Sequence, residues 1–420
     1  MSLLIRNAAV NGTTQDIYLK EGLISKIGTL QSFDADEVLD AQGKIALPSF
    51  FNTHTHAAMT LLRGYADDMF LQEWLEKKIW PAEARLSEED VYWGARLACL
   101  EMIKSGTTFF NDMYWFWQGT ARAVTEMGLR AALSIVMIDM GDTLKAREQF
   151  RLNEEFLAMS TTLDPKILCV LGPHAIYTVS EESLRWCADF SEKNSLMVHI
   201  HLSETEKEVI DCLNAHGKRP VEYLHSLGLL TPRTIIAHAV WVNDYEISLM
   251  SEHGVKVAHN PVSNMKLAVG SAMPYGKLKK AGVTVSLGTD GCSSNNNLDM
   301  MESMKFACLL QKFHSSDCCI LPAKEAFTMA TESGAKAFGL KAGVLDEGSL
   351  GDLILLDDHR ADMTPGHNIF SDIAYSASSA AVDTVVCDGK ILMRDGIVPG
   401  EDEIISKGKE YSRKFRLSSP

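Results

Sequence analysis

The chain has 420 residues, of which 46% are hydrophobic, and a formal net charge of -15 at pH 7. This length and hydrophobic content are sufficient for one large barrel of about 250 residues with a smaller domain beside it. The negative charge argues against a nucleic-acid partner, because a polyanion needs a basic surface.

The cysteines and the N-terminus indicate the cellular compartment. Nine cysteines without a CxxC pair are typical of reduced thiols rather than a disulfide framework. Near the N-terminus, Arg6 and polar residues stand where a signal peptide needs a long apolar core. Apolar runs fall short of the roughly 18 residues that cross a bilayer. We therefore expect a soluble, cytoplasmic protein with no membrane partner.

Short β-type runs separated by glycine turns occupy both ends of the chain. Residues 1–47 contain LLIRNAAV, DIYLKEGLISKIG and KIALP, and residues 345–420 contain GDLILLD and DTVVCDGKILMRDGIV. The shared pattern predicts that the two ends form one small β-sandwich domain.

The central part, residues 48–344, contains apolar runs that alternate with helix-length stretches. Counting one that starts just before this part, the runs are 45–56, 106–113, 129–137, 166–174, 196–204, 233–240, 254–261 and 282–290. Near-continuous hydrophobic runs are typical of parallel strands buried on both faces. Eight of them predict an α/β fold, a (β/α)8 TIM barrel. The alternative is an open doubly wound sheet, which more often has a glycine-rich phosphate turn after an early strand.

Polar residues stand at the C-terminal ends of these runs. His54 and His56 end the first run and share one strand face, because side chains alternate along a strand. His201, His238 and Asp290 end later runs. The C-terminal strand ends form the active-site face of such barrels. Imidazole and carboxylate together suit Zn²⁺ or Fe²⁺, so we predict a metal site; the alternative is a hydrogen-bond network without an ion.

Further residues near these ends have two interpretations each. Glu204 follows His201 by three residues and is predicted to shuttle a proton, although SETEKE also resembles a helix start with its cap. His199 is expected to support or pack against the ligands. The fourth run ends in His174 and begins with Lys166, so no lysine is available at its active-site end to bridge two ions. A single metal is therefore expected.

Seven motifs distributed over the barrel carry a resemblance to a known family. They are NTHTH, WPAEARL, GPHAIYTVS, HIHLSET, AHAVW, HNPVSNMKLAVG and LGTDGCSSNNNLDM. The chain resembles the amidohydrolase superfamily, specifically its 5'-methylthioadenosine/S-adenosylhomocysteine deaminase branch and chlorohydrolase-like members. The resemblance implies one divalent metal ion per subunit, zinc before iron, with the ligands His54, His56, His201 and Asp290.

The same resemblance implies roles in the reaction. His238 would bind the ion or the attacking water, and Asp290 would accept that water's proton. Glu204 would pass a proton to the ring nitrogen beside the amino-bearing carbon. A nucleoside would be the substrate, with its ribose hydroxyls bound by Glu83 in WPAEARL, since a carboxylate can accept from two adjacent hydroxyls. Otherwise Glu83 would be a solvated charge at a helix start.

Three more substrate contacts follow from the resemblance. His174 would touch the substrate, Ser294 would line the pocket, and Arg130 would receive the substrate's far end. A second family arginine, which binds a carboxylate tail, has no clean match among the nearby residues Lys145, Arg147 and Arg151. A methylthio or plain deoxy group at the 5' position is therefore favoured over S-adenosylhomocysteine.

These observations predict a metal-dependent hydrolytic deaminase of 5'-modified adenosines, which releases ammonia and the inosine analogue. The alternatives are a hydrolase of a free base or triazine from the same superfamily, and a non-catalytic metal-binding barrel. Assembly into a homo-oligomer stays open. The long stretch from Ala57 to Glu83 carries Trp74 and Trp80 and is expected to form a lid or binding wall.

Overall fold

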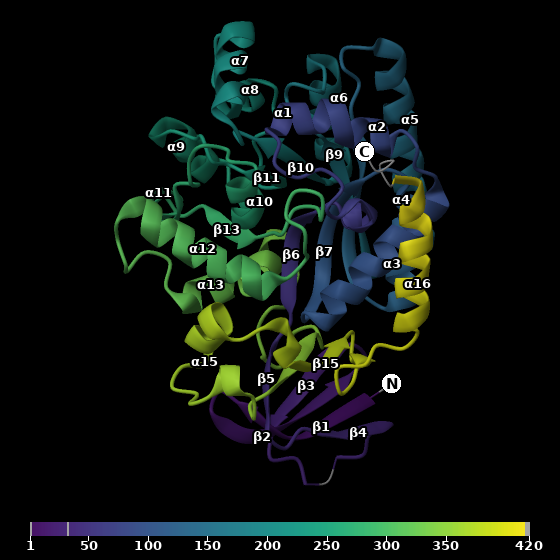
Figure 1. Ribbon diagram of the computed structural model, residues 1–420, viewed down its shortest axis with the longest axis vertical. Helices are drawn as coiled ribbons and strands as arrows, with labels where there is room; N and C mark the ends of the chain where they lie inside the picture. Colours follow the sequence, from purple (N-terminus) through teal and green to yellow (C-terminus); the bar gives the residue numbers. More distant parts are fainter. Residues whose placement is uncertain (1, 32, 416–420) are drawn as a thin grey trace.

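The protein is described by a computed structural model over residues 2–31 and 33–415, and a parallel barrel lies above a smaller sheet (Figure 1). The barrel order follows the chain. Its strands are β6 (Phe50–Thr55), β7 (Thr107–Tyr114), β8 (Arg130–Met137), β9 (Ile167–Pro173), β10 (Met197–Leu202), β11 (Thr234–His238), β12 (Lys256–His259) and β13 (Thr284–Leu287). Each strand coincides with one predicted apolar run, and only β7 extends beyond its run, by the single residue Tyr114. The expected α/β barrel is therefore confirmed.

The barrel closes where β13 meets β6. The Thr53 hydroxyl donates to the carbonyl of Leu287 at 3.0 Å, and the backbone N–H of Asp290 donates to the carbonyl of His54 at 2.9 Å. Gly288 permits this approach, because a Cβ there would lie 2.9 Å from the Cβ of His54. The contact holds His54 and Asp290, at the C-terminal ends of the first and last strands, side by side.

Helices surround the barrel between its strands (Figure 1). The longer ones, of eight residues or more, are α3 (Glu88–Lys104), α4 (Trp117–Met127), α5 (Thr143–Met159), α6 (Glu181–Asn194), α7 (Glu206–His216), α9 (Asp244–Glu252), α12 (Met300–Ser315), α13 (Ala323–Ala330) and α16 (Glu401–Tyr411). Shorter ones are α1 (Leu71–Trp74), α2 (Trp80–Glu83), α8 (Pro220–Ser226), α10 (Pro261–Lys266), α11 (Tyr275–Lys280), α14 (Glu332–Ala337) and α15 (Ile369–Ser371). Within the described ranges, no helix combines the length and the apolar character that crossing a membrane requires.

The two chain ends form one mainly antiparallel sheet with its own hydrophobic core. The order is β16-β15-β14-β5-β1-β2-β3, with β4 beside β1. Its strands are β1 (Ser2–Val10), β2 (Thr13–Lys20), β3 (Leu23–Gly28), β4 (Glu37–Asp40), β5 (Lys44–Pro48), β14 (Leu353–Asp357), β15 (Val382–Cys387) and β16 (Lys390–Met393). The antiparallel pairing of β5 with β14 joins the two ends, as predicted.

Two details differ from the sequence-based expectation. The apolar run 45–56 contains two strands rather than one. β5 lies in the small sheet, Ser49 separates the two strands, and β6 is the first strand of the barrel. The last helix, α16, lies beside α3 of the barrel rather than in the small domain (Figure 1), and the ring of Tyr411 stacks on that of Trp93 at 6.1 Å. Part of the predicted 345–420 segment therefore packs on the barrel.

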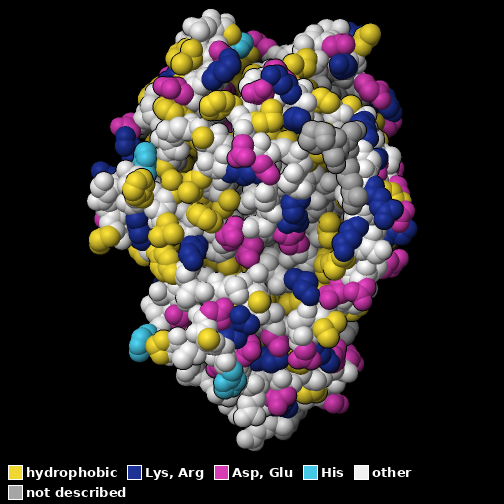
Figure 2. Space-filling view, in the orientation of Figure 1, with side chains coloured by type: hydrophobic (Ala, Val, Ile, Leu, Met, Phe, Trp, Pro, Cys, Tyr) yellow, Lys and Arg dark blue, Asp and Glu magenta, His cyan; other side chains and the backbone are white. Residues whose placement is uncertain are grey.

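Charged side chains of both signs are mixed on one face of the molecule. On the face shown in Figure 2, lysine and arginine side chains are interspersed with acidic ones and do not gather into a continuous basic patch.

Candidate active site

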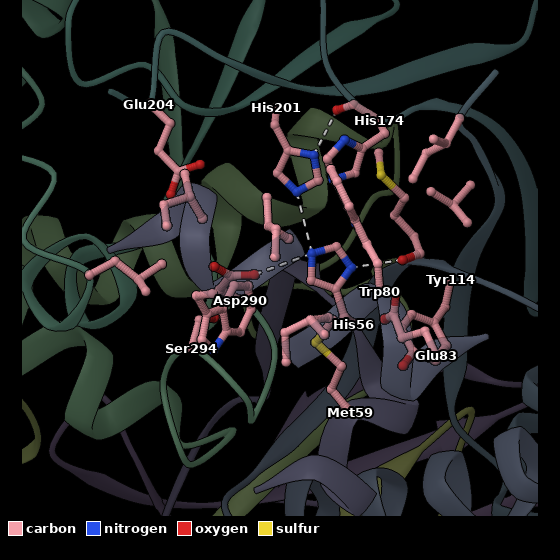
Figure 3. A pocket seen from close by; sticks show the side chains of 18 of the residues that line it. His56, Met59, Trp80, Glu83, Tyr114, His174, His201, Glu204, Asp290 and Ser294 are labelled. Atoms are coloured by element: carbon pink, nitrogen blue, oxygen red, sulfur yellow. Dashed lines mark hydrogen bonds and ion pairs between the residues drawn. The ribbon is translucent and has the colours of Figure 1, made fainter. Parts of the chain in front are cut away.

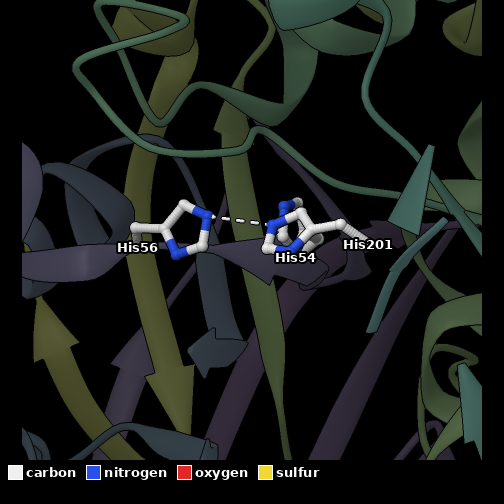
Figure 4. Close-up of side chains that lie close together, drawn as sticks. All are labelled: His54, His56 and His201. Carbon is white, nitrogen blue, oxygen red and sulfur yellow. Dashed lines mark hydrogen bonds between the residues drawn. The ribbon is translucent and has the colours of Figure 1, made fainter. Parts of the chain in front are cut away.

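Three histidine rings from two strands point toward one another at the C-terminal end of the barrel (Figure 4). Nε2 of His56 lies 3.3 Å from Nε2 of His201. Oδ1 of Asp290 lies 3.2 Å from Nε2 of His54 and 3.3 Å from Nε2 of His56. His238 forms a second such buried group with His54 and Asp290. The structure thus brings together all five predicted ligands.

The spacing and the donor atoms of this cluster fit a metal ion. Ligand atoms around a tetrahedral Zn²⁺, with Zn–N of about 2.0–2.1 Å, lie about 3.3 Å from one another. The measured separations of 3.2–3.3 Å match that value. Nε2 of His54 and Nε2 of His238 are buried without a hydrogen-bond partner among the described residues. A cation between them would relieve the cost of burying these two nitrogens.

Each histidine is oriented through its other ring nitrogen. Nδ1 of His56 bonds to the carbonyl of Met113 at 2.7 Å, and Nδ1 of His201 bonds to that of His174 at 2.7 Å. Nδ1 of His54 lies 2.9 Å from Nε2 of His199, so that residue is in contact with a predicted ligand, as expected. Such partners fix the ring orientation of metal-binding histidines and leave Nε2 for the ion.

His238 and Asp290 have supports that the sequence did not single out. The side-chain amide of Asn264 lies 2.9 Å from Nδ1 of His238. The Ser263 hydroxyl donates to Oδ2 of Asp290 at 2.6 Å. Both residues belong to α10, within the motif HNPVSNMKLAVG. The sequence motif therefore pointed to this segment, but it did not show that these two residues contact the predicted ligands. His238 and Asp290 also have positive φ angles, 78° and 63°, and such strain clusters at functional sites.

Burial governs the protonation of the site. It lowers the pKa of His174 and of His238 to about 3, so both rings are neutral at pH 7. Burial opposes ionisation of Asp290, but its contacts with His54 and His56 hold its pKa well below the usual range. His56 differs from these rings, because burial opposes its protonation but its contact with Asp290 raises its pKa to about 9. A metal ion that binds here would therefore displace a proton from His56.

A pocket opens beside the cluster and contains most of the predicted substrate contacts. Its lining includes Glu83, His174, Glu204 and Ser294 together with His56, His201, His238 and Asp290. Glu83 and Glu204 lie on opposite sides of the cluster (Figure 3). Oε1 of Glu204 lies 3.6 Å from Nδ1 of His238. Burial, reinforced by Asp290, raises the pKa of Glu204 well above its ordinary value.

The stretch from Ala57 to Glu83 forms one wall of the pocket, as expected. Trp74 and Trp80 both line it. Trp115, which lies after β7, also lines the pocket and donates from Nε1 to Oε2 of Glu83 at 3.1 Å. Glu83 is half-buried, which raises its pKa although the Trp115 hydrogen bond opposes the shift. Glu83 is therefore a carboxylate that lines the pocket and is oriented by a hydrogen bond, and not a solvated charge at a helix start.

Arg130 is not part of this site, contrary to the prediction. It stands at the first residue of β8, at the opposite end of the barrel from the histidines. Its Nε donates to Oδ2 of Asp352 at 2.7 Å, and its Nη2 donates to Oδ1 of Asp388 at 2.8 Å. Both partners belong to the C-terminal segment that forms the small sheet. Arg130 therefore ties that sheet to the barrel and is removed from the set of substrate contacts.

The Arg130→Ala variant is expected to lose about 3–5 kcal/mol of unfolding free energy, because the fully buried Asp352 would be left without its cation. Denaturant unfolding measures this loss. Arg185→Ala, which removes an exposed pair with Glu181, is the matched control and should cost at most about 1 kcal/mol. A raised KM with unchanged stability would instead return Arg130 to the substrate contacts.

Comparisons with known proteins agree with this geometry. The model of the amidohydrolase family matches residues 45–392. The chain is 51% identical over 412 residues to 5'-deoxyadenosine deaminase of Methanoregula boonei, covering 97% of this chain and 93% of that protein. It is 47% identical over 426 residues to 5-methylthioadenosine/S-adenosylhomocysteine deaminase 1 of Archaeoglobus fulgidus, covering 99% and 100%. Among solved structures, an adenosine deaminase from Xanthomonas campestris with bound zinc is 31% identical, with a TM-score of 0.93 and coverage of 99% and 98%.

Proposed function

The chain belongs to the amidohydrolase family, and from this we propose that it is a metal-dependent hydrolytic deaminase of 5'-modified adenosines. Water replaces the amino group of the purine, and ammonia and the inosine analogue are released. The relatives described as deaminases of 5'-deoxyadenosine and of 5-methylthioadenosine support this substrate class. The observation that carries the proposal is the position of Glu83 and Glu204 on opposite sides of the histidine cluster.

We propose a single ion, zinc before iron, held by His54, His56, His201 and Asp290, with His238 beside it. When bound, such an ion lowers the pKa of a coordinated water toward about 7 and supplies a nucleophile at neutral pH. The 3.2–3.3 Å separations of the side-chain atoms support one tetrahedral centre. Lys166 lies at the other end of β9 and pairs with Asp164 at 2.8 Å, so it is not available to bridge a second ion.

The residues around the cluster divide the proton transfers between them. Asp290 is ionised and is held at Oδ2 by Ser263 and at Oδ1 by the N–H of Gly291 at 2.8 Å, so it is placed to accept a proton from the attacking water. Glu204 is buried on the side of His238 and is placed to deliver a proton to the ring nitrogen beside the amino-bearing carbon. General acid–base steps of this kind need hydrogen-bond reach to the reacting atoms.

The other side of the pocket suits the sugar. Glu83 offers carboxylate oxygens to two adjacent ribose hydroxyls, with one of them oriented by Trp115. The aromatic and aliphatic lining between the two glutamates suits a flat, largely apolar purine. His174 is neutral, is oriented by Thr178 at 2.9 Å, and faces the same cavity.

The Glu83→Ala variant is expected to lower kcat/KM for adenosine-type nucleosides by about 10²-fold or more, because two hydroxyl contacts are lost together. Turnover of a free base should change by less than about threefold, since a base has no ribose. Ammonia release from 5'-deoxyadenosine and from guanine, measured in parallel, tests this. An equal loss with both compounds would contradict the ribose role.

The same comparison separates the alternatives. A hydrolase of a free base or triazine would have no need of Glu83, so the wild-type enzyme would then turn over guanine faster than any nucleoside. A non-catalytic barrel would release no ammonia from either compound. The strained backbone at His238 and Asp290 favours a working site over that last alternative.

We further propose that a short 5' group is preferred over an amino acid tail. Beyond Glu83 the pocket adjoins a groove lined by Trp80, Leu86, Trp115 and Ile138, in which Lys145 is an exposed cation. Arg151 is bound to Glu148 and Glu155 on the surface of α5. An apolar groove suits methylthio or deoxy groups, and kcat/KM should therefore be higher for these than for S-adenosylhomocysteine.

A further inference from the structure

Glu208 has an unusual place for a buried carboxylate in the first turn of a helix. It is the third residue of α7, and only 5% of it is exposed. In a capping box the third residue usually binds the N–H of the N-cap. Here the side chain reaches farther upstream: Oε1 accepts from the N–H of Ser203 at 2.9 Å, and Oε2 accepts from the N–H of Glu204 at 2.8 Å.

These two bonds hold a strained turn. Ser203 has a φ of 54°, a left-handed conformation that a residue with a side chain adopts only at a cost. On its other side the turn is held by β11 and the residues after it, since the carbonyl of Leu202 accepts from Ala239 at 3.1 Å and that of Ser203 accepts from Trp241 at 2.8 Å. Glu208 therefore supplies one of the two sets of hydrogen bonds that hold the turn between β10 and Glu204.

We propose that Glu208 is a positioning residue that sets where the carboxyl group of Glu204 lies in the pocket. The inference rests on the proton-transfer role of Glu204 in the proposed function. Glu208 itself does not line the reaction pocket; it lines the neighbouring cavity beside Tyr177 and Leu267. It therefore acts through the backbone of the turn, and a displacement of about 1 Å at such a site lowers the rate about 10²-fold.

The variant Glu208→Gln tests the role of these two hydrogen bonds with little change in side-chain volume. Glutamine keeps one accepting oxygen but turns an amide group toward the other backbone N–H, so two donors face each other. We expect kcat for 5'-deoxyadenosine to fall about 10- to 100-fold, with KM and metal content near the wild-type values. Wild-type kcat in this variant would overturn the inference.

A double-mutant cycle with Glu204→Gln separates positioning from a general structural defect. If Glu208 acts through Glu204, adding Glu208→Gln to Glu204→Gln lowers the residual kcat less than about threefold, because the group to be positioned is already absent. A further 10- to 100-fold fall in the double variant would show independent effects and overturn the inference. Full activity of Glu204→Gln alone would instead remove the proton-transfer role, and with it the basis of the positioning.

Glu246 provides the matched control. It is also a fully buried carboxylate at the third position of a helix, α9, and it accepts from the N–H groups of Asn243 and Val221. It differs from Glu208 in that it also pairs with Arg219, at 2.7 Å. Glu246→Gln is expected to lower the unfolding midpoint, as Glu208→Gln does, without the loss of kcat. An equal loss of kcat in both variants would show that any buried carboxylate has this effect, which contradicts the specific role of Glu208.

Discussion

Glu204→Gln is expected to lower kcat by about 10²–10⁴-fold while the metal content stays at the wild-type level. The amide has nearly the same shape but cannot deliver a proton to the purine nitrogen. Glu204 lies outside the proposed ligand set, 3.6 Å from Nδ1 of His238. Metal binding should therefore survive the substitution. Steady-state ammonia release and elemental analysis of the same preparation measure the two quantities.

Glu206→Gln is the matched control for this variant. Glu206 lies two residues farther along, in the first turn of α7, but its side chain is exposed. It should keep wild-type kcat. Turnover of Glu204→Gln at the wild-type rate would show that the proton travels by another route.

Asp290→Asn is expected to have the largest effect, a fall in kcat of about 10⁴-fold or more. The substitution removes a proton acceptor, which contributes about 10²–10⁴-fold, and it also weakens metal binding by removing an anionic ligand. The carboxylate lies 3.2–3.3 Å from two histidine nitrogens. Activity and metal content should therefore fall together. Added Zn²⁺ should restore the metal content of the variant more fully than it restores kcat.

Ser263→Ala gives a graded comparison. It removes only the hydrogen bond to Oδ2 of Asp290, and loss of such a supporting partner costs about 10- to 100-fold in activity or metal affinity. A larger loss in Ser263→Ala than in Asp290→Asn would contradict the assignment of Asp290 as the proton acceptor.

The barrel and its metal cluster could be predicted from sequence because both follow from strand periodicity. Runs such as 129–137 and 166–174 are long enough to identify strands. Residues two apart in a strand share a face, and this periodicity placed His54 with His56. The same logic also applies to Arg130. It is the second residue of the run 129–137, so its position in the run alone places it at the end of the barrel away from the site. The family resemblance was misleading for this residue.

Contacts between distant segments could not be read from the sequence. The bond from Trp115 to Glu83 joins two loops, and its geometry depends on how both cross the barrel mouth. The packing of α16 on α3 depends on how well two helix faces fit each other, and the sequence of α16 alone does not show which helix it contacts. From the sequence, Glu208 is an acidic residue in the first turn of a helix like many others, because the sequence does not show which way its side chain points.

The most direct test of the proposed function is ammonia release by the purified, zinc-loaded wild-type protein. Substrates are compared at equal concentration: 5'-deoxyadenosine, 5'-methylthioadenosine, S-adenosylhomocysteine, adenosine, adenine and guanine. The account predicts stoichiometric ammonia and the inosine analogue from the 5'-modified nucleosides, with the highest kcat/KM for the short 5' groups. No ammonia from any nucleoside, or a higher kcat/KM for a free base, would contradict it.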